Sequence, residues 1–463
     1  MPEPLVPGGT TPPAPTPVTT VSFPPIARRT LPNGLEVVVV EQRSLPWTVV
    51  VASVAIGDRD DPAGKEGLAS LAARLLREGT TLRRGHEIAL QVDVAGGSLE
   101  AAAHMDRTSV SFDALSSHND LALDIVADVL SRPVFPEEEV AQAKGRMQDE
   151  LVAMRGSPDV LAEELSARVT YGGHPYGRYA PSPESLARLG RRDLVGFHNA
   201  AYVPGAVKLI VAGDVDTETI VRDAARRFDT WETGSGPRAT LRRPPPAQRG
   251  IHLLDRPGSV QAHLRIALPA VNRSHRDFIA LEVCNRILGA GTTSRLFQNL
   301  RQRHGYTYSV HSTIEQRQLA SQIAIEASVR TEVAAAALAE IDRELANLDG
   351  GITKKELAAI LEEMIGQFPL SLESPHALAS RAVSLEHFSL PDDYWARYRD
   401  ALARVSLSDL RRVARRYALS AHRTTVVVGD AAALGTQLEK LGPVTPYAAG
   451  SMSMVSPHLG QSQ

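Results

Sequence analysis

Residues 186–214 read LARLGRRDLVGFHNAAYVPGAVKLIVAGD, and residues 402–430 read LARVSLSDLRRVARRYALSAHRTTVVVGD. Each stretch has a Leu-Ala-Arg step, then Asp-Leu, and then Gly-Asp after an apolar β-branched run. The three steps keep one spacing, because positions 186, 193 and 213 recur 216 residues later at 402, 409 and 429. A register held over this distance indicates an internal repeat. The sequence therefore predicts two homologous halves, each closing with a helix and a strand that ends in Gly-Asp.

The repeat sets the expected domain boundaries. We expect the halves at about 28–235 and 248–445, joined by a linker at 236–247 within the Pro- and Arg-rich stretch GPRATLRRPPPAQR. Residues 1–27 are rich in Pro and Thr and have neither a basic nor an apolar region typical of a signal peptide, so they predict a disordered tether. Residues 446–463 are expected to form a flexible tail.

The first half alternates strand and helix signals without regular βαβ units, which predicts an α+β fold. The turn and apolar run LPNGLEVVVV (31–40) and the run 47–56 predict two strands paired with each other. The Ala- and Leu-rich stretch 63–78 predicts a helix that stops at Gly79. Further along, we expect a helix at 87–95, strands within 98–114, and helices at 120–130 and 137–154.

Composition excludes several classes of protein. The chain has 463 residues, of which 43% are hydrophobic and 22% charged, as in ordinary globular proteins of more than one domain. Fifty Lys and Arg against 53 Asp and Glu give a net charge of −3, so no overall field attracts nucleic acid. No apolar stretch is long enough to span a membrane. The single cysteine, Cys284, lies in an apolar run and is expected to be a buried, inert thiol.

Several motifs together resemble the pitrilysin/insulinase family of zinc metallopeptidases, in the short-chain branch similar to mitochondrial processing peptidase subunits. The motifs are LPNGLEVVVVE (31–41), GLASLAARLLREGT (67–80), HPYGRYAPSPESLARL (174–189), VAGDVD (211–216) and SRLFQNLRQRHGYTYSV (294–310). The resemblance covers nearly the whole chain after the tether. It implies two halves that each contain an antiparallel-rich mixed sheet covered on one face by helices.

Active members of this family carry His-x-x-Glu-His in the helix that corresponds to residues 67–80. Two His one helical turn apart bind zinc, and the Glu activates the metal-bound water. Here the matching positions hold Ser70, Ala73 and Arg74, which cannot supply that chemistry. The resemblance places a third family ligand, a Glu, at Glu150. We expect Glu150 to be a surface residue of its helix or a partner of Arg74, and we expect no metal site in this chain.

Histidine spacing offers no replacement zinc site. None of the 14 His residues has a second His three or four positions later, so a helical two-His ligand pair cannot be formed. His304 and His311 flank the turn at Gly305 and are expected to be ordinary polar residues, and His86 is expected at the polar start of a helix.

The second half keeps a pair of residues that the family uses on substrates. In active assemblies an Arg and a Tyr, seven residues apart, hold the peptide backbone near the scissile bond, and the resemblance assigns them to Arg301 and Tyr308. A guanidinium and a phenol hydroxyl can both donate to a peptide carbonyl or to a developing oxyanion. The alternative is structural, with Arg301 capping a helix end and Tyr308 packing in a strand.

These observations predict a non-catalytic subunit of a heterodimeric zinc metalloendopeptidase. The zinc would reside in a homologous partner with an intact motif, and this chain would contribute peptide binding without a cofactor of its own. The alternative is a structural or interaction protein with the same fold and no role in proteolysis, and a homodimer also stays open. An independently active peptidase would need a zinc site that these residues do not supply. The expected compartment is the periplasm or cell envelope if an export signal was removed, and otherwise the cytoplasm.

Overall fold

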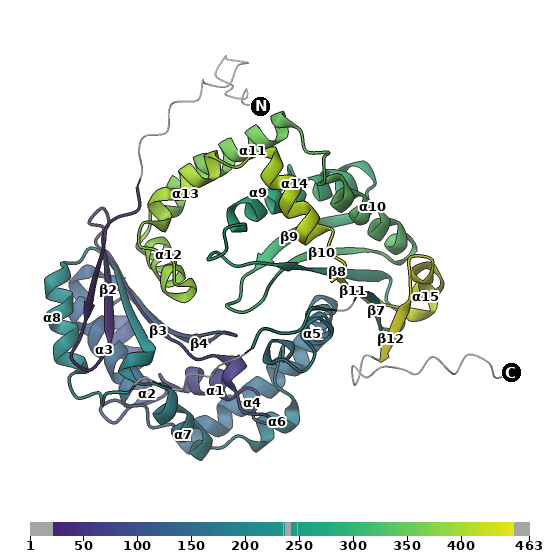
Figure 1. Ribbon diagram of the computed structural model, residues 1–463. Coiled ribbons are helices and arrows are strands. Elements are labelled where there is room, and N and C mark those ends of the chain that lie inside the picture. Colours follow the sequence, from purple (N-terminus) through teal and green to yellow (C-terminus); the bar gives the residue numbers. More distant parts are fainter. Residues whose placement is uncertain (1–21, 235, 237–241, 248, 449–463) are drawn as a thin grey trace, which may run out of the picture.

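The computed structural model describes residues 22–234, 236, 242–247 and 249–448, and it consists of two halves that each contain one six-stranded sheet (Figure 1). The sequence-predicted tether lies largely outside the described residues, and so does the predicted tail from residue 449 onward. Strand β1 begins at Ile26, inside the segment expected to be a tether, and β12 extends to Ala448. In the described part of the chain, none of the helices combines the length and the apolar character needed to span a bilayer.

The first sheet has the strand order β1-β2-β6-β3-β5-β4. Its strands are β1 (Ile26–Thr30), β2 (Glu36–Glu41), β3 (Trp47–Val54), β4 (Ser98–Ala103), β5 (Thr108–Leu115) and β6 (Val207–Gly213). The expected pairing of β2 with β3 is wrong, because β6 lies between them. Val211 faces Val39 of parallel β2 on one side and Val50 of antiparallel β3 on the other. The closing strand of the repeat thus inserts into the centre of the sheet.

The second sheet has the order β12-β7-β11-β8-β10-β9 and repeats this arrangement. Its strands are β7 (Gly250–Asp255), β8 (Gln261–Ala270), β9 (Thr307–Glu315), β10 (Ser321–Arg330), β11 (Thr424–Gly429) and β12 (Val444–Ala448). Strand β11 lies between β7 and β8 as β6 lies between β2 and β3. The two halves predicted from the 216-residue spacing are therefore confirmed, and both sheets mix parallel and antiparallel pairs.

Helices surround each sheet in the same chain order. The first half contains η1 (Asp58–Asp60), α1 (Leu68–Leu75), α2 (Gly85–Val94), η2 (Ser116–His118), α3 (Asn119–Ser131), α4 (Glu137–Arg155), α5 (Pro158–Tyr171), η3 (Pro175–Gly177), α6 (Pro183–Arg188), α7 (Arg191–Ala201), η4 (Pro204–Ala206) and α8 (Thr217–Phe228). The helix expected at 63–78 is shorter than predicted. It begins at Leu68, because Gly67 adopts a left-handed conformation with φ of 95° immediately before it.

The second half has a corresponding series of helices. It contains α9 (Phe278–Leu288), η5 (Phe297–Arg303), η6 (Thr331–Val333), α10 (Ala334–Asn347), α11 (Lys354–Gln367), η7 (Pro369–Leu372), α12 (Pro375–Phe388), α13 (Tyr394–Ala403), α14 (Leu407–Val413), η8 (Ala414–Ala418) and α15 (Ala431–Glu439). Both η5 and η8 are π-helices, and the other η elements are 3-10 helices.

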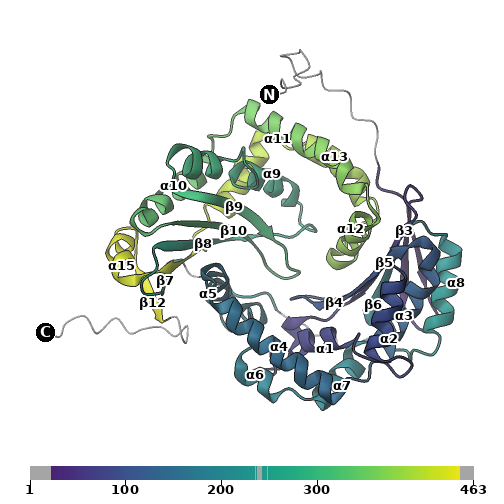
Figure 2. The ribbon, with the colours of Figure 1, turned by 180° about the vertical axis from the view of Figure 1, so that it is seen from behind.

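Each half contributes one helix to the opposite sheet, as Figures 1 and 2 show from two sides. Helix α5 of the first half packs on β8 and β11, and α12 of the second half packs on β2, β3 and β6. Both helices begin with a Ser-Pro step, at Ser157 and at Ser374. We expected helices on one face of each sheet. The structure adds to this expectation, because a helix from the other half of the chain covers the second face.

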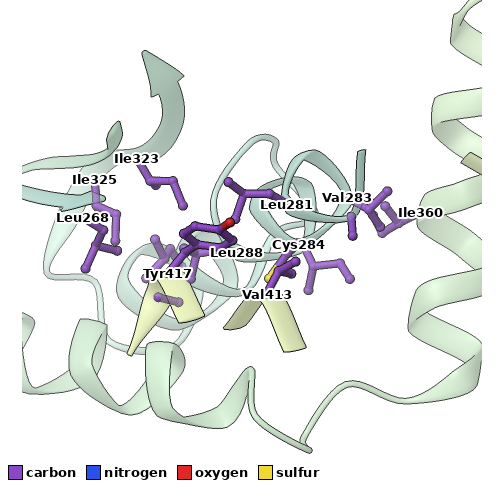
Figure 3. Packing of buried hydrophobic residues seen from close by; sticks show 14 of the residues in the cluster. Leu268, Leu281, Val283, Cys284, Leu288, Ile323, Ile325, Ile360, Val413 and Tyr417 are labelled. Carbon is purple, nitrogen blue, oxygen red and sulfur yellow. The ribbon is translucent and has the colours of Figure 1, made fainter. Parts of the chain in front are cut away.

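This helix exchange explains the continuous apolar run in β2. Val37 and Val39 join the core of the first half, whereas Val38 and Val40 join the core that includes α12. A strand that is buried on both faces is apolar at every position, unlike the alternating strand of a half-exposed sheet. The larger core continues into the second half, where Cys284 of α9 packs among Leu281, Leu288 and their neighbours (Figure 3). Burial raises the pKa of this thiol to about 12, as expected for an inert cysteine.

Candidate functional site

Helix α1 carries the positions that correspond to the family's zinc motif. Its N-terminus is fixed by Asp61, whose carboxylate accepts hydrogen bonds from the backbone N–H groups of Gly67 at 2.7 Å and Ala69 at 2.8 Å. These donors have no partners within the helix, so a buried carboxylate here replaces a capping side chain. Burial raises the pKa of Asp61 to about 7.

The three motif positions have different environments. Ser70 donates its hydroxyl hydrogen bond to Asp58 Oδ1 at 2.8 Å, and Ala73 is fully buried in the helix packing. Arg74 donates from Nη1 and Nη2 to the two oxygens of Glu150, at 2.9 and 2.7 Å. The expected pairing of Glu150 with Arg74 is therefore present, and it lowers the pKa of Glu150. The guanidinium takes both oxygens of the one carboxylate that matches a family ligand.

A cavity of about 150 Å³ lies at this place, and its wall is rich in acidic groups. Its charged lining consists of four carboxylates and two arginines, which are Asp58, Asp61, Glu66, Glu150, Arg74 and Arg178. Burial raises the pKa of Asp58 as well, although its hydrogen bond from Ser70 opposes this effect. Asp58 and Asp61 were not among the residues predicted from the sequence, although the acidic run DRDD at 58–61, six residues before α1, was a signal that could have found them.

The residues around α1 do not fit a zinc ion. Zinc in peptidases is held by imidazole nitrogens and carboxylate oxygens with one position left open for water. Here the matching carboxylate is engaged by a guanidinium, and the helix offers a hydroxyl and a methyl group where imidazoles would stand. Within the described ranges, no three or more His, Cys, Asp or Glu side chains are grouped as metal ligands.

Arg301 and Tyr308 come together in the second half. Arg301 lies in the π-helix η5 and Tyr308 near the start of β9, and the guanidinium carbon lies 4.6 Å from the centre of the Tyr308 ring. The same guanidinium lies 4.7 Å from the Phe297 ring. Tyr308 lies in a strand, as the structural alternative expected, but its side chain is 82% exposed. The half-buried Arg301 and the exposed Tyr308 can both reach a molecule that binds on this surface.

A β-bulge determines the direction of Tyr308. The register between β9 and β10 shifts between Ala327 and Val329, so Tyr308 and Ser309 together face one residue of β10. Thr307 stabilises this bulge, because its hydroxyl donates a hydrogen bond to the carbonyl of Ser328 at 2.7 Å. Bulges and π-helices both redirect side chains and are frequent next to functional sites.

A cavity of about 550 Å³ lies beside Tyr308 and includes a histidine–carboxylate pair. His311 Nε2 lies 3.1 Å from Glu326 Oε2, which raises the pKa of His311. Burial alone would raise the pKa of Glu326, but His311 and Arg265 together lower it to about 2. His311 thus lies within β9 and has an ionic partner, whereas the sequence analysis placed it beside a turn.

A buried charged network links the two cavities across the halves. Tyr179, which lines the acidic cavity, donates to Glu163 of α5, and Glu163 lies 3.4 Å from Arg265 of β8. Arg265 is only 3% exposed and also pairs with Glu326, the partner of His311. The network therefore runs from the first-half cavity, through the exchanged helix α5, to the cavity beside Tyr308.

Comparison with known families identifies the class of protein that this fold and these positions define. The family model of insulinase, peptidase family M16, matches residues 37–184, and the model of the peptidase M16 inactive domain matches residues 188–364. The chain belongs to peptidase family M16 and lacks the His-x-x-Glu-His motif of its active members.

Particular relatives are similar to this chain over most of its length. An uncharacterized zinc protease of Bacillus subtilis, YmxG, is 27% identical over 77% of this chain and 87% of its own. An uncharacterized zinc protease of Mycobacterium leprae is 28% identical over 77% of this chain and 81% of its own. The solved structure of a peptidase M16 inactive domain from Pseudomonas fluorescens has a TM-score of 0.82 at 24% identity, covering 88% of this chain and 98% of that one. A protease from Helicobacter pylori has a TM-score of 0.83 at 22% identity, covering 88% and 99%.

Proposed function

We propose that this chain is the non-catalytic subunit of a two-chain zinc metalloendopeptidase. In this proposal a homologous subunit with an intact His-x-x-Glu-His motif holds the zinc and cleaves the peptide. This chain carries no cofactor and holds the peptide backbone near the scissile bond. The observation that carries the proposal is the contrast between Arg74, which is paired with Glu150, and Arg301, which stacks on the exposed Tyr308.

The proposed role follows from the donors that the pair presents. The Arg301 guanidinium and the Tyr308 hydroxyl both donate hydrogen bonds, and a peptide carbonyl accepts them. When the carbonyl oxygen gains negative charge during hydrolysis, both hydrogen bonds become stronger. The Phe297 and Tyr308 rings hold the guanidinium between them, so little reorganisation is needed when substrate binds. The zinc supplied by the partner would activate the attacking water.

The test is a reconstitution of the chain with its motif-bearing homologue from the same source. We expect peptide cleavage by the mixture only, with zinc retained by the partner. In that mixture, Arg301→Ala or Tyr308→Phe should slow cleavage by about ten- to a thousandfold, the range for loss of one oxyanion donor. Arg303→Ala is the matched control, because Arg303 is an exposed arginine of the same π-helix.

The outcomes separate this proposal from a structural role. Arg303→Ala should leave the rate unchanged and all variants should bind the partner equally well. An unchanged rate in both Arg301→Ala and Tyr308→Phe would contradict the role of the pair. If the chains neither associate nor gain activity, the structural alternative is favoured instead. Cleavage by the pure chain with added zinc would refute the non-catalytic assignment.

A further inference from the structure

A second cavity lies in the second half at the counterpart of the acidic cavity. A Gly-Thr step follows each of the helices α1 and α9, beginning at Gly79 and at Gly291. Aligning these two steps places the helices 212 residues apart. With this spacing Ser70 corresponds to Glu282 and Arg74 to Arg286. Arg286 pairs with Glu363 of α11, just as Arg74 pairs with Glu150 of α4. Each half therefore has an Arg–Glu pair at corresponding positions of these helices, although the surrounding residues differ.

The second-half cavity has a volume of about 340 Å³ and a mixed lining. The residues used in the argument below are Glu282, Asn285, Arg286, Gln316, Phe368 and Arg381. They come from α9, α12, the segment that follows β9, and the residue directly after α11. Whereas Asp58 and Asp61 make the first-half cavity acidic, an arginine without an acidic partner lies in this one.

The charges around this cavity leave one cation uncompensated. Arg286 pairs with Glu363, and Arg273 donates to Glu282 at 3.0 Å. Among the described residues, no carboxylate lies within ion-pair distance of Arg381. Burial and the nearby positive charge of Arg273 lower the pKa of Arg381 to about 10, although the charge of Glu282, which also lines the cavity, opposes this effect. A half-buried guanidinium of this kind gains much from an anion that enters the cavity.

The hydrogen bonds of Arg381 leave part of its guanidinium free. Its Nε donates to the Ser371 carbonyl at 3.2 Å and its Nη2 donates to the Ser371 hydroxyl, whereas Nη1 makes no hydrogen bond to any described residue. The guanidinium carbon lies 4.9 Å from the Phe368 ring centre and 4.3 Å from that of Trp395. These two rings fix the orientation of the guanidinium, so Nη1 is available as a donor without further ordering.

Two acceptors complete the site. The side-chain oxygens Asn285 Oδ1 and Gln316 Oε1 are both buried and have no hydrogen-bond partner within the described structure. Asn285 donates from Nδ2 to the Ser312 carbonyl at 3.2 Å, which orients its oxygen as the acceptor. Buried acceptors without partners are costly, and a ligand that supplies N–H donors would remove this cost.

We propose that the second-half cavity binds a carboxylate group that has an N–H donor close to it. The carboxylate would accept from Arg381, and the N–H would donate to Asn285 or Gln316. An acidic side chain next to its own backbone amide has this chemistry, and so does the carboxyl terminus of a peptide. The inference concerns binding by this chain alone, so it does not depend on the proposed pairing with a zinc-bearing subunit.

The test measures the binding of small probes to the purified full chain by titration calorimetry. N-acetyl-aspartamide presents a side-chain carboxylate and N-acetyl-glycine a terminal one, each with an adjacent N–H. Acetate and inorganic phosphate present an anion without that donor, and N-acetyl-glycinamide presents the N–H without the anion. We expect at least one of the first two to bind ten or more times more tightly than the other three. The tighter of the two identifies the source of the carboxylate.

Substitutions connect that binding to the cavity. Arg381→Met should weaken binding of the preferred probe at least tenfold, because it removes the guanidinium that the carboxylate would contact. Arg397→Met is the matched control, because Arg397 is an exposed arginine of the neighbouring helix α13 and pairs with Asp393. It should bind the probe as the unmodified chain does.

A second variant keeps the test decisive if Arg381→Met does not fold. Gln316→Glu changes the shape of the side chain little and supplies a carboxylate inside the cavity, so it should also weaken probe binding at least tenfold. The proposal is overturned if neither carboxylate probe binds, if acetate or phosphate binds equally well, or if a folded Arg381→Met or Gln316→Glu variant binds as tightly as the unmodified chain.

Discussion

Arg74, Arg265 and Arg381 differ in the carboxylates that face them. Arg74 pairs with Glu150 near the surface, and buried Arg265 contacts Glu163, Glu315 and Glu326. Arg381 has no carboxylate within ion-pair distance among the described residues and is held by aromatic rings instead. At the scale of single residues, the same side chain therefore occupies a position that matches the family's zinc motif, joins the two halves, or is available to a ligand.

The sequence could predict some of these residues and not others. The resemblance to the family located Ser70, Ala73 and Arg74, and pairing with Arg74 was one of two roles expected for Glu150. The sequence could not identify Arg381, because the absence of a carboxylate partner depends on how α12 packs in three dimensions. The sequence also could not show that Asp61 accepts hydrogen bonds from the N–H groups of Gly67 and Ala69. These contacts depend on α1 beginning at Leu68.

Glu326 gives the protein a specific response to acid. Its pKa in the folded protein is about 2, below the ordinary 4.5, so its stabilising effect is complete above pH 4.5 and is lost as the pH falls towards 2. We expect Glu326→Gln to destabilise the protein by about 3 kcal/mol at pH 6 and to have little effect near pH 2. Denaturant unfolding at both pH values measures this difference.

The control for this prediction is Glu332→Gln, which changes an exposed carboxylate of the same half. It should shift the free energy of unfolding by less than about 0.5 kcal/mol at both pH values. A loss of stability in Glu326→Gln that is the same at pH 6 and pH 2 would contradict the role of its ionised carboxylate.

At the scale of elements, the local sequence predicted where helices and strands occur better than it predicted which elements lie next to each other. The runs at 31–40 and 47–56 do form strands, but β6 separates them, and β6 is more than 150 residues away in the sequence. Periodicity reports which face of a strand is buried but not which strand lies next to it. The β-bulge at Tyr308 was also beyond prediction, because it depends on the register of β9 against β10.

The two exchanged helices differ in their N-terminal caps despite the same Ser-Pro start. The Ser374 hydroxyl accepts a hydrogen bond from the Ala377 N–H at 3.2 Å, whereas the Ser157 hydroxyl donates to Asp159. Ser374→Ala should therefore destabilise the protein by about 1 kcal/mol, and Ser157→Ala by less. Chemical denaturation of both variants compares them directly, and an equal or larger loss in Ser157→Ala would contradict this interpretation.

At the scale of the whole molecule, one apolar core passes from the first sheet, through α12, into the second half. The repeat predicted two halves, but it could not predict that each would cover the other's sheet. The helical patterns of α5 and α12 show that each has a buried face, and only the tertiary structure shows what lies against it. The apolar runs of β2 and β3 were local signs that both faces of the first sheet are buried.

The shared core predicts that the halves unfold together. We expect calorimetry to show a single cooperative transition in which the van't Hoff and calorimetric enthalpies agree. The first half alone would expose Val38, Val40, Val49 and Val51, which α12 covers in the full chain. We therefore expect residues 22–234 to aggregate when expressed alone. Two separate transitions, or a soluble monomeric first half, would show that the halves are independent.

The exchange of α5 and α12 also bears on how duplicated sequences diverge. Helix α12 packs on the first sheet and also carries Arg381 of the second-half cavity. A substitution on α12 therefore acts on both the cavity and the contact between the halves. The cavity wall at Asp58 and Asp61 lies outside α5 and α12, so substitution there leaves that contact unchanged. The first-half cavity is thus freer to change its chemistry than the second-half cavity.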